Sequence, residues 1–202
     1  MSKRNLLDFP TLFSYTPTDT AQAFTSVESY LGDEYHNVFI PSNEFMNNTI
    51  FPANALSVGA GRTSGWQMTA AGTCGINHNQ IRKQNWINGG IKVTVYYYGD
   101  VSDNTKNIKW GYLWTPFTSG SNVTTATPLD IQVTIAGPTT ANLVQSYTFS
   151  TLAACTNPSV LFYGLRILRF GADAADTYTG NIVVLGVMLN YFNYIKSGIP
   201  NN

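Results

Sequence analysis

The feature that most constrains the fold is a succession of short apolar segments between residues 79 and 194, separated by turns and nearly free of charge. Each segment is rich in β-branched and aromatic residues, which favour strands. The clearest segments are Ile91–Tyr98, Asn107–Trp114, Leu129–Ile135, Leu143–Phe149, Val160–Leu168 and Ile182–Phe192. Counting from Gly65 gives about eight strands, the number in a jelly roll. The pattern is typical of an all-β sandwich or barrel.

The first fifty residues do not follow this pattern. Pro10 and Pro17 interrupt short apolar pieces, and only Thr25–Leu31 suits a short helix. A long segment without regular structure is unusual in a compact domain, and apolar residues are rare in disordered tails, so we interpret it as an arm that binds neighbouring subunits. The apolar arm residues are Leu6, Leu7, Phe9, Leu12, Phe13 and Phe24. We predict an arm at 1–54, one jelly-roll-like antiparallel sandwich at 55–195 and a C-terminal tail at 196–202.

Charge is scarce in the 202-residue chain. Charged residues make up 11% of it, against roughly 25% in an average soluble protein. Because surface charge normally keeps a monomer soluble, a neutral surface rich in Tyr and Asn favours burial against other subunits. The zero net charge argues against a nucleic-acid partner, which needs a basic surface. No apolar run reaches the ~18 residues of a membrane span and no signal peptide is evident, which predicts folding in a cytoplasm.

Few residues suit catalysis or cofactor binding. Cys74 and Cys155 lack a CxxC spacing and are predicted to be free thiols. The two histidines, His36 and His78, lie outside any catalytic motif, His78 in an expected turn at Gly75–Asn79. The short Gly59–Gly61 stretch lacks the Lys-Ser/Thr of a phosphate-binding loop. The sequence therefore predicts a protein that is not an enzyme and holds no cofactor.

One loop gathers acidic residues between two apolar strands. Asp173 and Asp176 are weak candidates for a metal site, since a calcium ion needs six or more oxygen ligands and no further acid is near in sequence. The favoured interpretation is a structural ion pair, in which Asp176 returns to Arg166 or Arg169 on the preceding strand. A bidentate Arg–carboxylate pair of this kind would fix the loop.

Aromatic residues form two rows at strand spacing. The rows are Trp110, Tyr112 and Trp114 on one strand, and Tyr96 and Tyr98 on the previous one. Alternate residues of a strand share a face, so each row presents its rings to one side. Flat aromatic faces suit sugar rings and protein interfaces alike. Because Ile108 belongs to the same face as the first row, that row is favoured as core, and glycan binding by it is the alternative.

Three stretches resemble a module of bacteriophage virion proteins. They are Trp86–Tyr98, Ile108–Tyr112 and Leu165–Tyr191, and the run from Arg169 to Gly180 is the most specific of the resemblance. The resemblance covers roughly half of the chain and leaves out residues 1–64. It implies a jelly-roll-like structural component of a virion, of the capsid-decoration, head-fibre or tail-appendage type, and it supplies no catalytic residue.

These observations lead to two main hypotheses. The first is a structural subunit of a phage virion, assembled in the host cytoplasm as a trimer and attached to other virion proteins through the arm; subunit packing would cover its strand edges. The alternative is a carbohydrate- or receptor-binding module that uses the aromatic rows. A hydrolase is a third hypothesis and requires His78 to meet an aspartate in a cleft.

Overall fold

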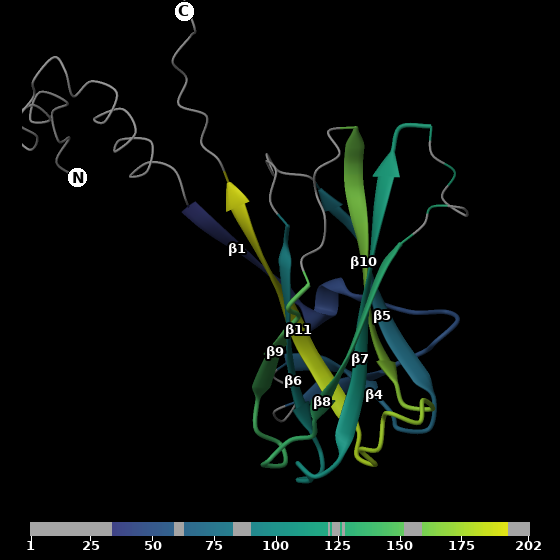
Figure 1. Ribbon diagram of the computed structural model, residues 1–202, viewed down its shortest axis with the longest axis vertical. Coiled ribbons are helices and arrows are strands. Elements are labelled where there is room, and N and C mark those ends of the chain that lie inside the picture. Colours follow the sequence, from purple (N-terminus) through teal and green to yellow (C-terminus); the bar gives the residue numbers. More distant parts are fainter. Residues whose placement is uncertain are drawn as a thin grey trace, which may run out of the picture.

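Two sheets of antiparallel strands pack face to face in the computed structural model, which describes residues 34–58, 63–82, 90–120, 122, 126, 128–151 and 159–193. Figure 1 shows β6, β9 and β11 in one layer and β5, β7 and β10 in the other. The protein is an all-β sandwich, as the sequence predicts. From β4 to β11 the described residues contain eight strands, and the chain repeatedly changes sheet, as in a jelly roll.

Sheet A and sheet B have different strand orders. Sheet A has the order β3 (Asn54–Val58), β4 (Thr63–Met68), β11 (Ile182–Asn193), β6 (Lys92–Gly99) and β9 (Gln145–Thr148), and β1 (Glu34–Pro41) also pairs with β11. Sheet B has the order β2 (Met46–Asn47), β5 (Thr73–Arg82), β10 (Val160–Phe170), β7 (Asn107–Thr118) and β8 (Leu129–Ala136). A 3-10 turn, η3 (Ser42–Glu44), links β1 to sheet B. No helix in these parts of the chain is long and apolar enough to cross a membrane.

The core lies between the sheets and is built from alternate residues of each strand. On β7, Trp110, Tyr112 and Trp114 are at most 1% exposed, because every second side chain points inward. Tyr97 of β6 meets Trp110 edge to face, with 5.3 Å between ring centroids. Large aromatic rings therefore supply much of the contact between the layers.

The sandwich includes Glu34–Pro41, which the sequence assigned to the arm at 1–54, so the predicted boundary at residue 55 is wrong in this respect. All eight residues of β1 pair with β11, from Glu34 opposite Asn193 to Pro41 opposite Gly186. Of its side chains Ile40 is buried, and the polar first half carries no strand periodicity that a sequence pattern could detect. The six apolar arm residues, the expected helix at Thr25–Leu31 and the tail at 196–202 lie outside the described residues.

A second difference concerns the predicted turn at Gly75–Asn79. These residues belong to β5, where Gly75 pairs with Leu168 of β10. A Cβ at Gly75 would lie 2.4 Å from Leu168 Cδ2, so this glycine permits close packing and does not form a turn.

Replacement of Trp114 by alanine tests its place in the core. Its indole stacks on Tyr163 with 4.7 Å between ring centroids, and its loss should lower the free energy of unfolding by about 3–5 kcal/mol. Urea denaturation followed by far-UV circular dichroism measures this change. Leu143→Ala, at a residue that is 54% exposed, is the control and should change stability by at most about 0.5 kcal/mol. A Trp114→Ala protein as stable as this control would contradict the core assignment.

Candidate functional site

The outer face of sheet B carries the candidate site. On β7, Tyr112 and Trp114 point into the core, so Leu113 and Thr115 point outward and are partly exposed. On β10, Arg166 is opposite Leu113 and also points outward. The alternation that fills the core with aromatic rings thus leaves a mixed polar and apolar surface on the other side of the same strands.

The glycines of sheet B differ in whether neighbouring side chains pack over them on the outer face. A Cβ at Gly75 would meet Leu168, and one at Gly111 would lie 2.6 Å from the Phe170 ring. Those two side chains therefore cover the sheet at one end. At Gly164 the described atoms nearest to such a Cβ are Phe117 Cε2 at 3.3 Å and Thr115 Cβ at 4.0 Å. The backbone of β10 at Gly164 therefore has no side chain of its own on this face and borders the Phe117 ring.

A groove of about 290 Å³ includes Gly164 in its lining. Its lining residues are Asn77, Leu113, Thr115, Phe117, Ala126, Pro128, Gly164, Leu165 and Arg166. The pairing of β10 with β5 shifts register between Tyr163 and Gly164, next to the groove. Such bulges bend a strand and are frequent beside binding sites. The volume is at the lower end of the range for small-molecule sites, about 300–1,000 Å³.

The charged side chain of the groove is held in place by two asparagines. Arg166 Nε donates to Asn77 Oδ1 at 3.0 Å, and Asn48 Nδ2 donates to the same oxygen at 3.3 Å. Asn48 is buried, and its own Oδ1 accepts hydrogen bonds from the backbone N–H groups of Ile50 and Phe51. Arg166 is therefore fixed to the rigid sheet through a chain of hydrogen bonds that begins at the buried Asn48.

An aromatic wall bounds the groove at the other end of β7. The Phe117 ring stacks on Phe162 with 4.9 Å between centroids and 25° between planes. This stacking restricts the orientation of the Phe117 ring, and both side chains remain partly exposed. The groove thus combines an aromatic side chain, a hydroxyl at Thr115, an amide at Asn77 and a guanidinium at Arg166. These groups suit binding of a polar ligand that also has an apolar face.

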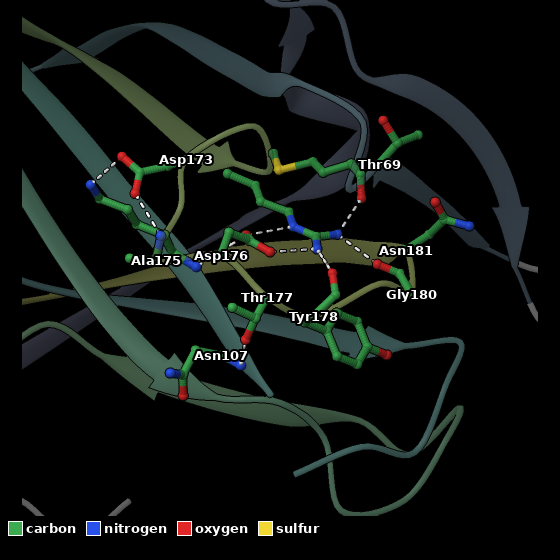
Figure 2. A network of polar contacts seen from close by, with 12 residues as sticks. Thr69, Asn107, Asp173, Ala175, Asp176, Thr177, Tyr178, Gly180 and Asn181 are labelled. Atoms are coloured by element: carbon green, nitrogen blue, oxygen red, sulfur yellow. Dashed lines mark hydrogen bonds and ion pairs between the residues drawn. The ribbon is translucent and has the colours of Figure 1, made fainter. Parts of the chain in front are cut away.

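Arg169, three residues after Arg166, lies on the inner side of β10 and is fully buried. It forms a bidentate pair with Asp176, Nε to Oδ2 at 3.0 Å and Nη2 to Oδ1 at 2.9 Å. Its remaining donors reach the carbonyls of Met68, Tyr178 and Gly180. Figure 2 shows Asp176, Tyr178 and Gly180 converging on this guanidinium. Asp176 therefore returns to Arg169, and Arg166 takes no part in the pair.

Asp173, the other acid of the loop, has a different partner. Lys109 Nζ donates to its Oδ2 at 2.6 Å, and the Ala175 N–H donates to its Oδ1. The hydrogen bond from Lys109 is the main cause that lowers the pKa of Asp173 below its usual value. The two candidate metal ligands thus face separate cations, and no group of three or more potential ligands comes together among the described residues.

The two aromatic rows differ in burial: the row on β7 is buried and the row on β6 is partly exposed. Trp110, Tyr112 and Trp114 are in the core, which confirms the favoured prediction for this row and makes the alternative of a glycan surface there wrong. Tyr96 and Tyr98 lie on the outer face of sheet A and are partly exposed. Phe39 of β1 meets Tyr96 edge to face, with 5.8 Å between ring centroids.

The hydrolase hypothesis requires His78 to meet an aspartate, and no aspartate of the described residues lies against it. His78 Nε2 lies 3.7 Å from a carboxylate oxygen of Glu44, and its ring packs on Phe45. Burial lowers the pKa of His78, and the nearby Glu44 carboxylate opposes this effect. Cys74 is a buried free thiol. Cys155, the Gly59–Gly61 stretch and the side chain of His36 lie outside the described residues.

Sequence reasoning missed most of the groove. Asn77, Thr115, Phe117 and Gly164 received no role, and Arg166 was assigned to the ion pair. One signal was present, since an isolated glycine inside an apolar strand marks a bulge or a close approach, and Gly164 lies inside Val160–Phe170. The pairing of Asn77 with Arg166 joins residues 89 positions apart, which no local pattern indicates.

No protein-family model matches the sequence, and no curated protein does. Among solved structures, the CBM22-1 xylan-binding domain of Paenibacillus barcinonensis Xyn10C is similar at 6% identity and a TM-score of 0.45, covering 80% of this chain and 97% of that domain. An exo-β-1,3-galactanase of Phanerochaete chrysosporium is similar at 11% identity and a TM-score of 0.45 over 76% of this chain. The arabinose-bound MgGH51 α-L-arabinofuranosidase gives 8% identity and a TM-score of 0.47 over 79% of this chain.

This chain spans 29% of the galactanase and 26% of the arabinofuranosidase. At these identities and TM-scores, the likenesses do not assign a function.

Replacement of Asp176 by alanine tests the buried pair. The change leaves the Arg169 guanidinium buried without a counter-charge, so the free energy of unfolding should fall by about 3–5 kcal/mol. Urea denaturation measures the loss. Asp173→Ala removes the exposed acid of the same loop and should leave stability nearly unchanged. Equal stability of the two variants would show that Arg169 does not depend on Asp176.

Proposed function

We propose that this β-sandwich is a carbohydrate-binding module that holds a saccharide in the groove over Gly164. The observation that carries the proposal is the combination, in one open groove, of the Phe117 ring with the side chains of Asn77, Thr115 and Arg166. A sugar ring presents C–H groups on its face and hydroxyls around its edge. It can therefore pack on an aromatic side chain and exchange hydrogen bonds with amide, hydroxyl and guanidinium groups.

The groove is a binding surface without catalytic groups among its lining residues. None of the nine lining residues that the structure describes is an aspartate, a glutamate, a histidine or a cysteine, which are the usual groups of hydrolytic catalysis. Glycoside cleavage in particular needs two acids across the bond that breaks. The proposed role is accordingly recognition of a saccharide and not its hydrolysis.

Filling the groove tests the proposal. Isothermal titration calorimetry against neutral and uronate-containing oligosaccharides should detect binding by the natural protein, and Gly164→Val should weaken it at least about tenfold, or about 1.4 kcal/mol. The valine side chain would occupy the space over β10 that the ligand needs. Gly72→Ala is the matched control, since a Cβ there meets nothing within 4 Å. Absence of binding throughout, or equal binding by Gly164→Val, would overturn the proposal.

A second candidate is a structural subunit of a phage virion, packed against copies of itself as a trimer and against other virion proteins. It is supported by the low charge content and by apolar residues on β1, where Phe39 is 51% exposed and Val38 is 38% exposed. Such residues suit contact with another chain. In this role residues 1–33 would attach the subunit to its partners.

Two truncations test the assembly role. Deletion of residues 1–33 keeps every described strand and should give a folded sandwich that no longer joins its partners. Deletion of residues 1–50 also removes β1 and β2, so it should expose the β11 edge and destabilise the domain. Analytical ultracentrifugation measures assembly, and thermal unfolding measures stability. Normal assembly by the protein lacking residues 1–33 would contradict this role.

A further inference from the structure

We infer that the groove over Gly164 selects saccharides that carry an acidic group, a carboxylate or a sulfate, and that Arg166 is the residue that determines this selectivity. The inference rests on the proposed carbohydrate binding and specifies its ligand class. It depends on three observations: the charge of the groove, the fixed orientation of Arg166, and the contrast between Arg166 and the other cations of sheet B.

Among the described residues that line the groove, Arg166 has the single charged side chain. Arg166 of β10 pairs with Leu113 of β7, and Leu113 pairs with Asp130 of β8. Asp130 is therefore an acid on the same outer face, two strands away from Arg166. Asp130 forms no ion pair with Arg166 among the described residues. Asp130 also accepts a hydrogen bond from Gln132. The groove is thus a locally cationic site in a chain with no net charge.

The orientation of Arg166 is fixed before any ligand binds. Asn77 accepts the Nε–H of Arg166 and is itself held by the buried Asn48. This arrangement uses one of the five guanidinium donors and leaves the four terminal N–H groups without a partner among the described residues. A planar pair of nitrogens presented in this way matches the two oxygens of a carboxylate or sulfate. Asn77 and Asn48 are positioning residues for that contact.

Two other cations of sheet B, both with described side chains, have carboxylate partners. Arg169 directs its donors to Asp176 and to three backbone carbonyls. Lys109 binds Asp173 at 2.6 Å. Arg166 is bonded only to a neutral amide in the described part of the chain. A cation that is kept partly exposed and oriented, yet lacks an acid, is suited to an anionic group supplied by a ligand.

The test compares ligands that differ only in charge. Titration calorimetry would use oligogalacturonate and its methyl ester as the carboxylate pair, and a sulfated galactan oligosaccharide and its desulfated form as the sulfate pair. We expect at least tenfold tighter binding of the acidic member of one pair, and a preference that decreases with rising salt concentration. Which pair shows the preference identifies the acidic group.

Variants then assign the preference to Arg166. Arg166→Gln should abolish the preference, so that the acidic and neutral members of a pair bind with similar affinity. Arg166→Lys should restore part of it, because an ammonium cannot form the bidentate contact. Lys109→Gln, which removes a cation of the same face outside the groove, should retain the full preference. Thermal unfolding checks that each variant is folded.

Three results would overturn the inference. Equal affinity for acidic and neutral members, or a preference that survives Arg166→Gln, would refute acidic selectivity and leave carbohydrate binding intact. Absence of binding to all four oligosaccharides and to the neutral oligosaccharides used with Gly164→Val would refute the proposed function together with this inference.

Discussion

The buried pair of Arg169 and Asp176 is the interaction on which the arrangement of the two sheets depends. Arg169 belongs to β10 of sheet B, whereas the carbonyls that it binds belong to Met68, at the end of β4, and to Gly180, just before β11 of sheet A. One guanidinium therefore connects both layers and the loop between β10 and β11. Taking two charges out of water is costly, and it is tolerated here because all the donors of Arg169 reach oxygen atoms.

Strand alternation gives Arg166 and Arg169 opposite roles. Because the two residues are three apart on β10, they point to opposite faces of sheet B. The inward arginine is neutralised by an acid, and the outward one remains available beside a groove. The same alternation on β7 buries Trp114 and exposes Leu113 and Thr115. The chemistry of the outer face is thus a direct consequence of how the core is filled.

The sequence predicted the central strands because they are runs rich in β-branched and aromatic residues and are bounded by turns. β6, β7, β8, β10 and β11 were all expected, with ends that differ from the structure by a few residues. β1 was missed because few of its residues face the core, and the start of β5 was missed because Gly75 resembled a turn residue. The rule that failed at Gly75 treats glycine as a marker of turns, whereas here it allows Leu168 to pack on the backbone.

The candidate site could not be predicted in the same way. The groove is lined by residues of β5, β7, β10 and the loop before β8. One of these residues is Gly164, which adds no side chain to the groove. The return of an aspartate to an arginine was expected because the loop is short, and Arg169 and Asp176 are only seven residues apart. A local sequence pattern can thus predict an ion pair between residues that are close in sequence. A groove on the face of a sheet can be located only when the register of all its strands is known.

The two candidate functions use different faces of the sandwich. The groove lies on the outer face of sheet B, whereas Phe39, Tyr96 and Tyr98 lie on the outer face of sheet A. A Cβ at Gly186 would lie 2.5 Å from the Phe39 ring, so this ring is packed directly on β11 and extends the apolar surface of sheet A. A subunit that packs through sheet A would keep the groove of sheet B open. Assembly and saccharide binding are therefore compatible in one molecule, and loss of one need not abolish the other.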